Sequence, residues 1–178
     1  MPTGPKKGLN AARKVGSGPD NKGLNSYAIA SGYATVLGKG DPVKLVSGTL
    51  QRATNDTADA IGVFQGVSYT DSNGNTVFSS IWPASTVATD IEALVLDDPG
   101  ATFRAVGDSS VASVVPGEIY ALNLTNADTT IKHSTVDVDI DGGTVAASAG
   151  LVKIVSVVDA ATNELEVVLV DHDLRDDG

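Results

Sequence analysis

The feature that most constrains the fold is a succession of short β-type runs, separated by turn residues, that begins at Tyr33. Strands at such close spacing, with turns rather than helices between them, are typical of a β-sandwich or a small barrel. Asn73-Gly74 can supply the positive φ angles of a tight hairpin, and Asp97–Gly100 reads as a reverse turn, so the pairing should be mainly antiparallel. The predicted fold is therefore all-β, an antiparallel β-sandwich or small barrel. The expected strands are Tyr33–Leu37, Pro42–Val46, Ala60–Tyr69, Thr76–Ile81, Asp90–Leu96, Thr102–Val106, Ile119–Leu124, Thr130–Ile140, Leu151–Val158 and Glu164–Asp171.

The first 32 residues differ from this pattern because glycines and prolines interrupt every possible period and apolar residues are few. We divide the chain into an extended, basic, Gly/Pro-rich N-terminal arm, residues 1–32, and a β-rich body, residues 33–178. Two states of the arm stay open from the sequence. One is a disordered tail, and the other is an extended segment that becomes ordered only against a partner.

Charge is distributed unevenly along the chain. Residues 1–40 hold six cations and one acid, a net charge of +5, so the remainder carries −15 of a total of −10. A body this acidic repels nucleic acid, and we expect no direct DNA or RNA binding. The asymmetry suits a basic arm that lies on an acidic neighbour.

No apolar run approaches the ~20 residues that a membrane helix requires, so no membrane span is expected. The cations near the N-terminus are not followed by the apolar stretch of a signal peptide. We therefore expect a protein that is made in the cytoplasm and remains there.

Few residues point to chemistry. The absence of cysteine excludes disulfides, thiolate metal sites and a cysteine nucleophile. Asp137–Gly142 resembles the opening of a calcium-binding loop, but the twelfth position is Ser148 rather than a bidentate acid, and Val138 and Ile140 fit a strand face. The oxygen-rich segment Asp71–Asn75 is what a hairpin turn requires in any case. We predict no metal site and no cofactor.

An enzyme is not expected either. The two histidines, His133 and His172, lie near no recognisable nucleophile motif, so we predict no catalytic residues. Carboxylate pairs on separate strands could in principle hydrolyse glycosides, but aromatic residues are only 4% of the chain, and sugar-binding clefts usually present aromatic platforms.

Binding to other proteins is the remaining reading. Trp82, the single tryptophan, is either a core residue or an anchor for a partner. The candidate partner-binding residues are Trp82 and the cations of the arm, Lys6, Lys7, Arg13, Lys14 and Lys22.

Residues 40–106 carry a series of motifs in a fixed order. They are GDPV at 40–43, IGVF at 61–64, a Y-x-D-x-x-G turn at 69–74, WP at 82–83 and ALV-x-DDP at 93–99. In this order they resemble the head decoration, or capsid cement, proteins of tailed phages. The glycines at 62 and 66, inside an expected strand, indicate a bulge or a close approach of another backbone.

The resemblance implies a virion structural protein on the outer capsid surface, which binds at junctions between subunits of the major capsid protein, often as a trimer. Its function would be to stabilise the shell against the pressure of packed DNA, with the arm as an extended strap. A tail or fibre module is the alternative, and a carbohydrate-active enzyme is less favoured.

Overall fold

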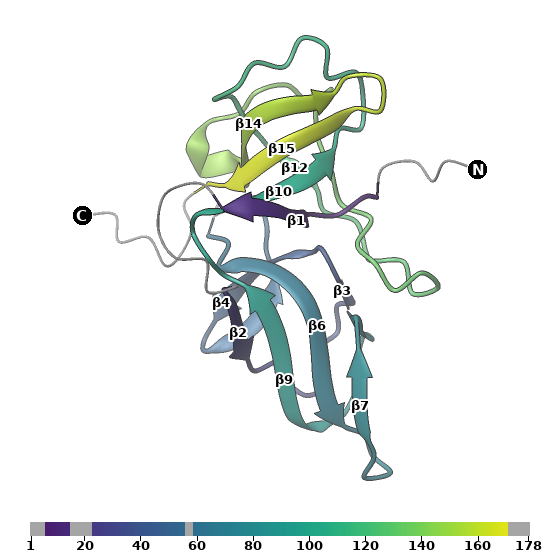
Figure 1. The fold of residues 1–178 in the computed structure, drawn as a ribbon. Helices are drawn as coiled ribbons and strands as arrows, with labels where there is room; N and C mark the ends of the chain where they lie inside the picture. The colour runs from purple at the N-terminus through teal and green to yellow at the C-terminus, as the bar shows by residue number, and fades with distance from the viewer. Residues whose placement is uncertain (1–5, 15–22, 56–58, 171–178) are drawn as a thin grey trace.

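The computed structural model describes residues 6–14, 23–55 and 59–170, and it is almost entirely β (Figure 1). Every pair of named strands is antiparallel, and the sheets pack against one another without closing into a barrel. The predicted all-β class is confirmed, and of the two architectures the sandwich is the one observed. No helix in the described part of the chain has the length and apolar character needed to cross a membrane.

The first sheet has five strands and contains both the first strand of the chain and the last two. Its last two strands, β14 and β15, pair with each other and correspond to the expected strands Leu151–Val158 and Glu164–Asp171. In spatial order the strands are β1 (Asn10–Lys14), β10 (Ala101–Val106), β15 (Glu164–Leu169), β14 (Val152–Asp159) and β11 (Ile119–Tyr120).

The second sheet has six strands built around β6 (Gly62–Thr70). Strand β9 pairs along most of one edge of β6, while β4 and β7 pair with the start and the end of the other edge. The other strands are β2 (Leu24–Tyr27), β9 (Thr89–Leu96), β4 (Pro42–Val46), β5 (Thr49–Arg52) and β7 (Thr76–Ser79).

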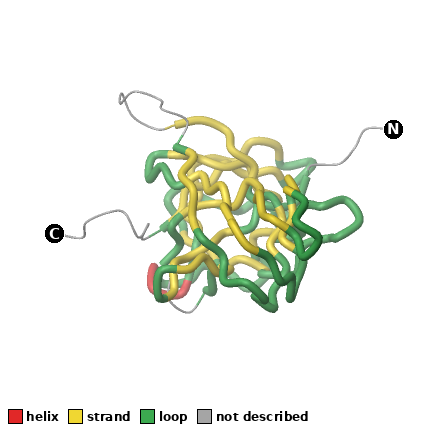
Figure 2. Tube along the Cα trace, turned by 90° about the horizontal axis from the view of Figure 1, so that it is seen from below, coloured by secondary structure: helices red, strands yellow, loops and turns green. Residues whose placement is uncertain are grey.

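Short elements complete the structure. β3 (Leu37–Gly38) pairs with β8 (Ile81–Trp82), and β12 (Leu122–Asn123) pairs with β13 (Asp137–Val138). A single turn of 3₁₀-helix spans Ala147–Ala149. Seen from below, the strands form the interior of the molecule, and loops surround them (Figure 2).

Two clusters of buried apolar side chains support the two sheets. They arise because alternate residues of each strand point to the same face. The first cluster lies with the five-stranded sheet and includes Phe103, Leu122, Leu151, Ile154 and Leu165. The second lies with the six-stranded sheet and includes Leu37, Phe64, Tyr69, Trp82 and Val95.

Two parts of the N-terminal arm form strands, and both strands pair with the body of the same chain. Strand β1 forms an edge of the five-stranded sheet through its pairing with β10, and β2 forms an edge of the six-stranded sheet through β9. Leu9, just before β1, is only 1% exposed and belongs to the first core cluster. The described part of the arm is therefore neither a disordered tail nor a segment that is ordered only against a partner, because it is ordered against its own chain.

Two expected strands are much shorter than predicted. In the segment predicted as Thr130–Ile140, only Asp137–Val138 is a strand, because the Asp128 side chain accepts hydrogen bonds from the amides of Thr130 and Ile131 and turns the chain there. Of Tyr33–Leu37, only Leu37 lies in a strand.

Candidate functional site

Three cations of the arm are paired with acids of the same chain. Lys7 Nζ lies 2.5 Å from Asp137 Oδ2, Arg13 Nε lies 2.6 Å from Glu166 Oε1, and Lys14 Nζ lies 2.8 Å from Asp98 Oδ2. The three acids come from β13, from β15 and from the turn after β9. The acidic neighbour expected for the arm is thus, for these residues, the protein's own body.

Glu166 receives hydrogen bonds from several side chains. Its carboxylate, almost wholly buried, accepts hydrogen bonds from Arg13, from Thr102 Oγ1 at 2.8 Å and from Ser156 Oγ at 3.4 Å. The hydrogen bond from Arg13 lowers the pKa of Glu166, against the opposing effect of burial, and the same contact raises the pKa of Arg13. Their hydrogen bonds link the four neighbouring strands β1, β10, β15 and β14.

The remaining cations of the predicted set differ in their surroundings. Lys6 is exposed, and no ion pair involves it within the described ranges. The side chains of Lys7 and Arg13 are 54% and 62% exposed despite their ion pairs, so one side of each stays open to a partner. Lys22 lies outside the described residues.

Trp82 does not fit the role of a surface anchor. It is 0% exposed and packs edge-to-face against Tyr69, with ring centroids 5.4 Å apart. Because Trp82 is fully buried, it cannot contact a partner in this conformation, and the prediction that it binds a partner is wrong. Of the two readings of Trp82, the core residue is the one observed.

Comparison of the chain with known protein families, with curated proteins and with solved structures finds no match. The interpretation of the site therefore depends on its geometry.

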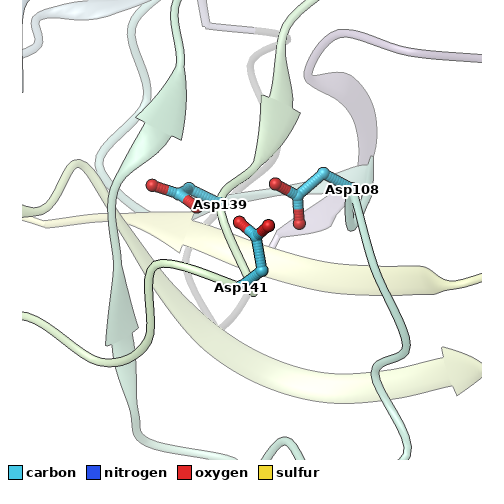
Figure 3. A group of neighbouring side chains, drawn as sticks. All are labelled: Asp108, Asp139 and Asp141. Carbon is cyan, nitrogen blue, oxygen red and sulfur yellow. The ribbon is translucent and has the colours of Figure 1, made fainter.

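The acidic motif at residues 137–142 is divided by the fold. Asp137 points inward to Lys7, whereas Asp139 and Asp141 meet Asp108, which follows β10 (Figure 3). One carboxylate oxygen from each of these three lies within 4.8 Å of the others. Sequence reasoning missed Asp108, since nothing in its local sequence indicates the contact with so distant a segment.

The three carboxylates are already engaged by protein groups. Asp108 accepts from the Ile140 amide at 2.9 Å, and Asp139 accepts from the Gly142 amide at 2.9 Å. Burial acts to raise the pKa of Asp108, but the hydrogen bonds that it receives from the Ile140 amide, from the Asn123 side chain and from Asp141 outweigh this effect and lower the pKa. The hydrogen bond with Asp139 and the charge of Asp108 raise the pKa of Asp141, so Asp141 takes up a proton more readily than an isolated aspartate.

The segment Asp71–Asn75 forms a hairpin turn between β6 and β7, as predicted. Asp71 Oδ1 accepts the amides of Asn73 and Asn75, both at 2.9 Å, and Gly74 has a φ of 80°. The amide of Asn75 is the main reason that the pKa of Asp71 is lowered.

Of the two histidines, the structure describes only His133. His133 Nδ1 contacts the carbonyl oxygen of its neighbour Ser134 at 3.2 Å. His172 lies outside the part of the chain that the structure describes.

Proposed function

We propose that this protein is a virion structural protein that binds the outer surface of a tailed-phage capsid, at junctions between major capsid protein subunits, and stabilises the shell against internal DNA pressure. The support for this proposal is that the motifs of the resemblance lie together in the fold. The motifs of residues 40–99, which resemble those of capsid cement proteins, fold together as β4, β6, the β6–β7 turn, β8 and β9, around the second core cluster.

This unit is suited to a mechanical role. A sheet whose inner face is packed with Phe64, Tyr69 and Trp82 resists deformation, because packed interiors have low compressibility. Many copies that each grip two neighbouring subunits stabilise a closed lattice even when each contact is modest, since the second contact forms at high effective concentration. On this proposal the protein is made in the host cytoplasm and acts on the capsid as a homo-oligomer, a trimer.

The arm is the part of the surface that we assign to the capsid contact. Lys6 is unpaired within the described residues, and Lys7 and Arg13 each keep more than half of the side chain exposed. Arg13 lies on the edge strand β1 and the two lysines lie just before it, and an acidic patch of the major capsid protein would meet the exposed parts of these side chains.

The decisive experiment mixes the purified protein with expanded capsids that lack it and measures co-sedimentation and copy number. Saturable binding supports the proposal, and the absence of binding contradicts it. Deletion of residues 1–30 is a poor test of the arm, because it also removes β1, β2 and the buried Leu9. Lys6→Glu is cleaner, and it should weaken binding while leaving the fold intact.

The same preparations separate the alternatives. A tail or fibre module should form long end-to-end assemblies in electron micrographs. A carbohydrate-active enzyme should release reducing sugars from polysaccharides, and neither result is expected.

A further inference from the structure

The outer face of the six-stranded sheet carries a groove of about 540 Å³ that no described segment covers. Its floor is made by small residues of β6, Gly66 and Ser68. Phe78 on β7 stands on one side, and Leu94 on β9 stands on the other. In Figure 1, β7 lies at the outer margin of its sheet, beside β6.

Phe78 is the most exposed large apolar side chain among the described residues, at 81%, and Leu94 is 42% exposed. Cross-strand register places Phe78 opposite Ser68, and Ser68 opposite Glu92, so Phe78 faces the groove over a small neighbour. An aromatic ring in water beside an open groove costs free energy that burial against a partner recovers. The face therefore has a projecting group and a hollow side by side.

Charge on this face identifies the partner. Lys39 lies at the β7 side of the groove, where its amide bonds to the carbonyl oxygen of Ser80 at 2.9 Å. Glu92 lies at the β9 side. Both are exposed, and among the described residues neither takes part in an ion pair. A uniformly basic or acidic partner would satisfy one of these charges and repel the other.

We propose that a second copy of this chain docks on this face, related by a two-fold axis, so that Lys39 of each copy meets Glu92 of the other and Phe78 enters the opposite groove. A two-fold contact requires a self-complementary patch, and this face offers a cation, an acid, a projecting ring and a hollow. Because Lys39 and Phe78 both lie at the β7 side of the face, the rotation that brings Lys39 to the opposite Glu92 also brings Phe78 to the β9 side of the opposite groove, beside Leu94. The contact is independent of capsid binding.

The test measures the mass of the full-length protein in solution by sedimentation equilibrium over a range of concentrations. The wild type is expected to form a reversible dimer. Phe78→Ser should weaken the association about tenfold or more, as the loss of a central aromatic contact does. Val115→Ser is the matched control, because Val115 is 56% exposed but lies outside the groove, and it should have no effect.

Charge reversal tests the pairing itself. Lys39→Glu alone and Glu92→Lys alone should each be monomeric, because each places like charges together at both contacts. An equimolar mixture of the two variants should recover a dimer, since every contact then joins opposite charges.

Three results would overturn the proposal: a wild type that is monomeric at all concentrations, a dimer that tolerates both reversals, or a mixture that fails to associate. A monomer whose capsid binding is lost in Phe78→Ser would assign the groove to the capsid instead. No capsid is present in the solution tests, so a failure here leaves the proposed function standing, and failure to bind capsids leaves the dimer standing.

Discussion

Arg13 on β1 reaches across β10 to Glu166 on β15, with 2.6 Å between Nε and Oε1. The two residues lie near opposite ends of the chain, and Thr102 on the intervening strand donates to the same carboxylate oxygen. The contact therefore fixes the edge strand β1 to the centre of the five-stranded sheet. It also explains how a segment with few apolar residues becomes part of a sheet.

Glu166→Gln is expected to lower the free energy of unfolding at neutral pH by about 0.5–1 kcal/mol, a modest value because the Arg13 side chain is largely exposed and screened. The pKa of Glu166 is lowered in the folded protein, so its stabilisation is present above the unfolded pKa and is lost as pH falls through the folded value. The unfolding temperatures of the wild type and of Glu166→Gln, measured by circular dichroism, should become equal below about pH 4. A difference that persists in acid would contradict this account.

Trp82→Ala is expected to destabilise the protein by about 3–5 kcal/mol, the usual cost of removing a large buried ring. Trp82→Phe should cost clearly less, because a ring remains to pack against Tyr69 and the lost Nε1–H has no hydrogen-bond partner in the described structure. Denaturant unfolding measured by far-ultraviolet circular dichroism compares both variants with the wild type. Equal costs would mean that packing against Tyr69 does not hold this region together.

Strands with strong local patterns could be predicted from the sequence. Pro42–Val46 has the predicted bounds, and the turn at Asn73-Gly74 is where its residue types place it. Asn10–Lys14 and Leu24–Tyr27 could not be predicted, because neither has the alternation of a half-buried strand. Each becomes a strand by pairing with β10 or β9, which is a tertiary effect.

The candidate site was predictable in part for a similar reason. The arm cations stand out in the sequence, but their partners Asp98, Asp137 and Glu166 come from distant segments that only the fold brings near. For Trp82, the local sequence Ile81-Trp82-Pro83 is compatible with core or surface. Its burial depends on β6 and on Tyr69, which no local pattern encodes.

Gly62→Ala should destabilise the protein by about 1–3 kcal/mol or more, as overpacking does. A methyl group at this position would lie 2.3 Å from the carbonyl oxygen of Leu96 on the paired strand β9, and the backbone there has no room to move. Gly66→Ala is the matched comparison in the same strand, at a bulge, where the nearest atom is Ser79 O at 3.1 Å. Gly66→Ala should destabilise the protein less than Gly62→Ala does, and the denaturant midpoints of unfolding of the two variants measure the difference. The reverse order would refute the close approach at Gly62.

Asp41→Asn should act in the opposite sense to Glu166→Gln and stabilise the protein at alkaline pH. Asp41 is 0% exposed; its Oδ2 accepts the Gly38 amide at 2.8 Å, while Oδ1 has no hydrogen-bond partner among the described residues. Burial raises the pKa of Asp41, so the folded protein gains stability as pH falls through that value and loses it as pH rises.

Asparagine can still accept the Gly38 amide through its side-chain oxygen, and it has no charge to bury. At about pH 8 the Asp41→Asn variant should therefore be more stable than the wild type by about 1 kcal/mol or more. The difference should shrink as the pH falls through the raised pKa of Asp41 and the native carboxylate takes up a proton. The melting temperatures of the wild type and of Asp41→Asn, measured between about pH 4 and about pH 8, test this prediction. Glu166→Gln serves as the control of opposite sign, because this variant is less stable than the wild type at neutral pH and the difference disappears only below about pH 4. A wild type more stable than Asp41→Asn at alkaline pH would mean that the buried carboxylate has a compensating partner.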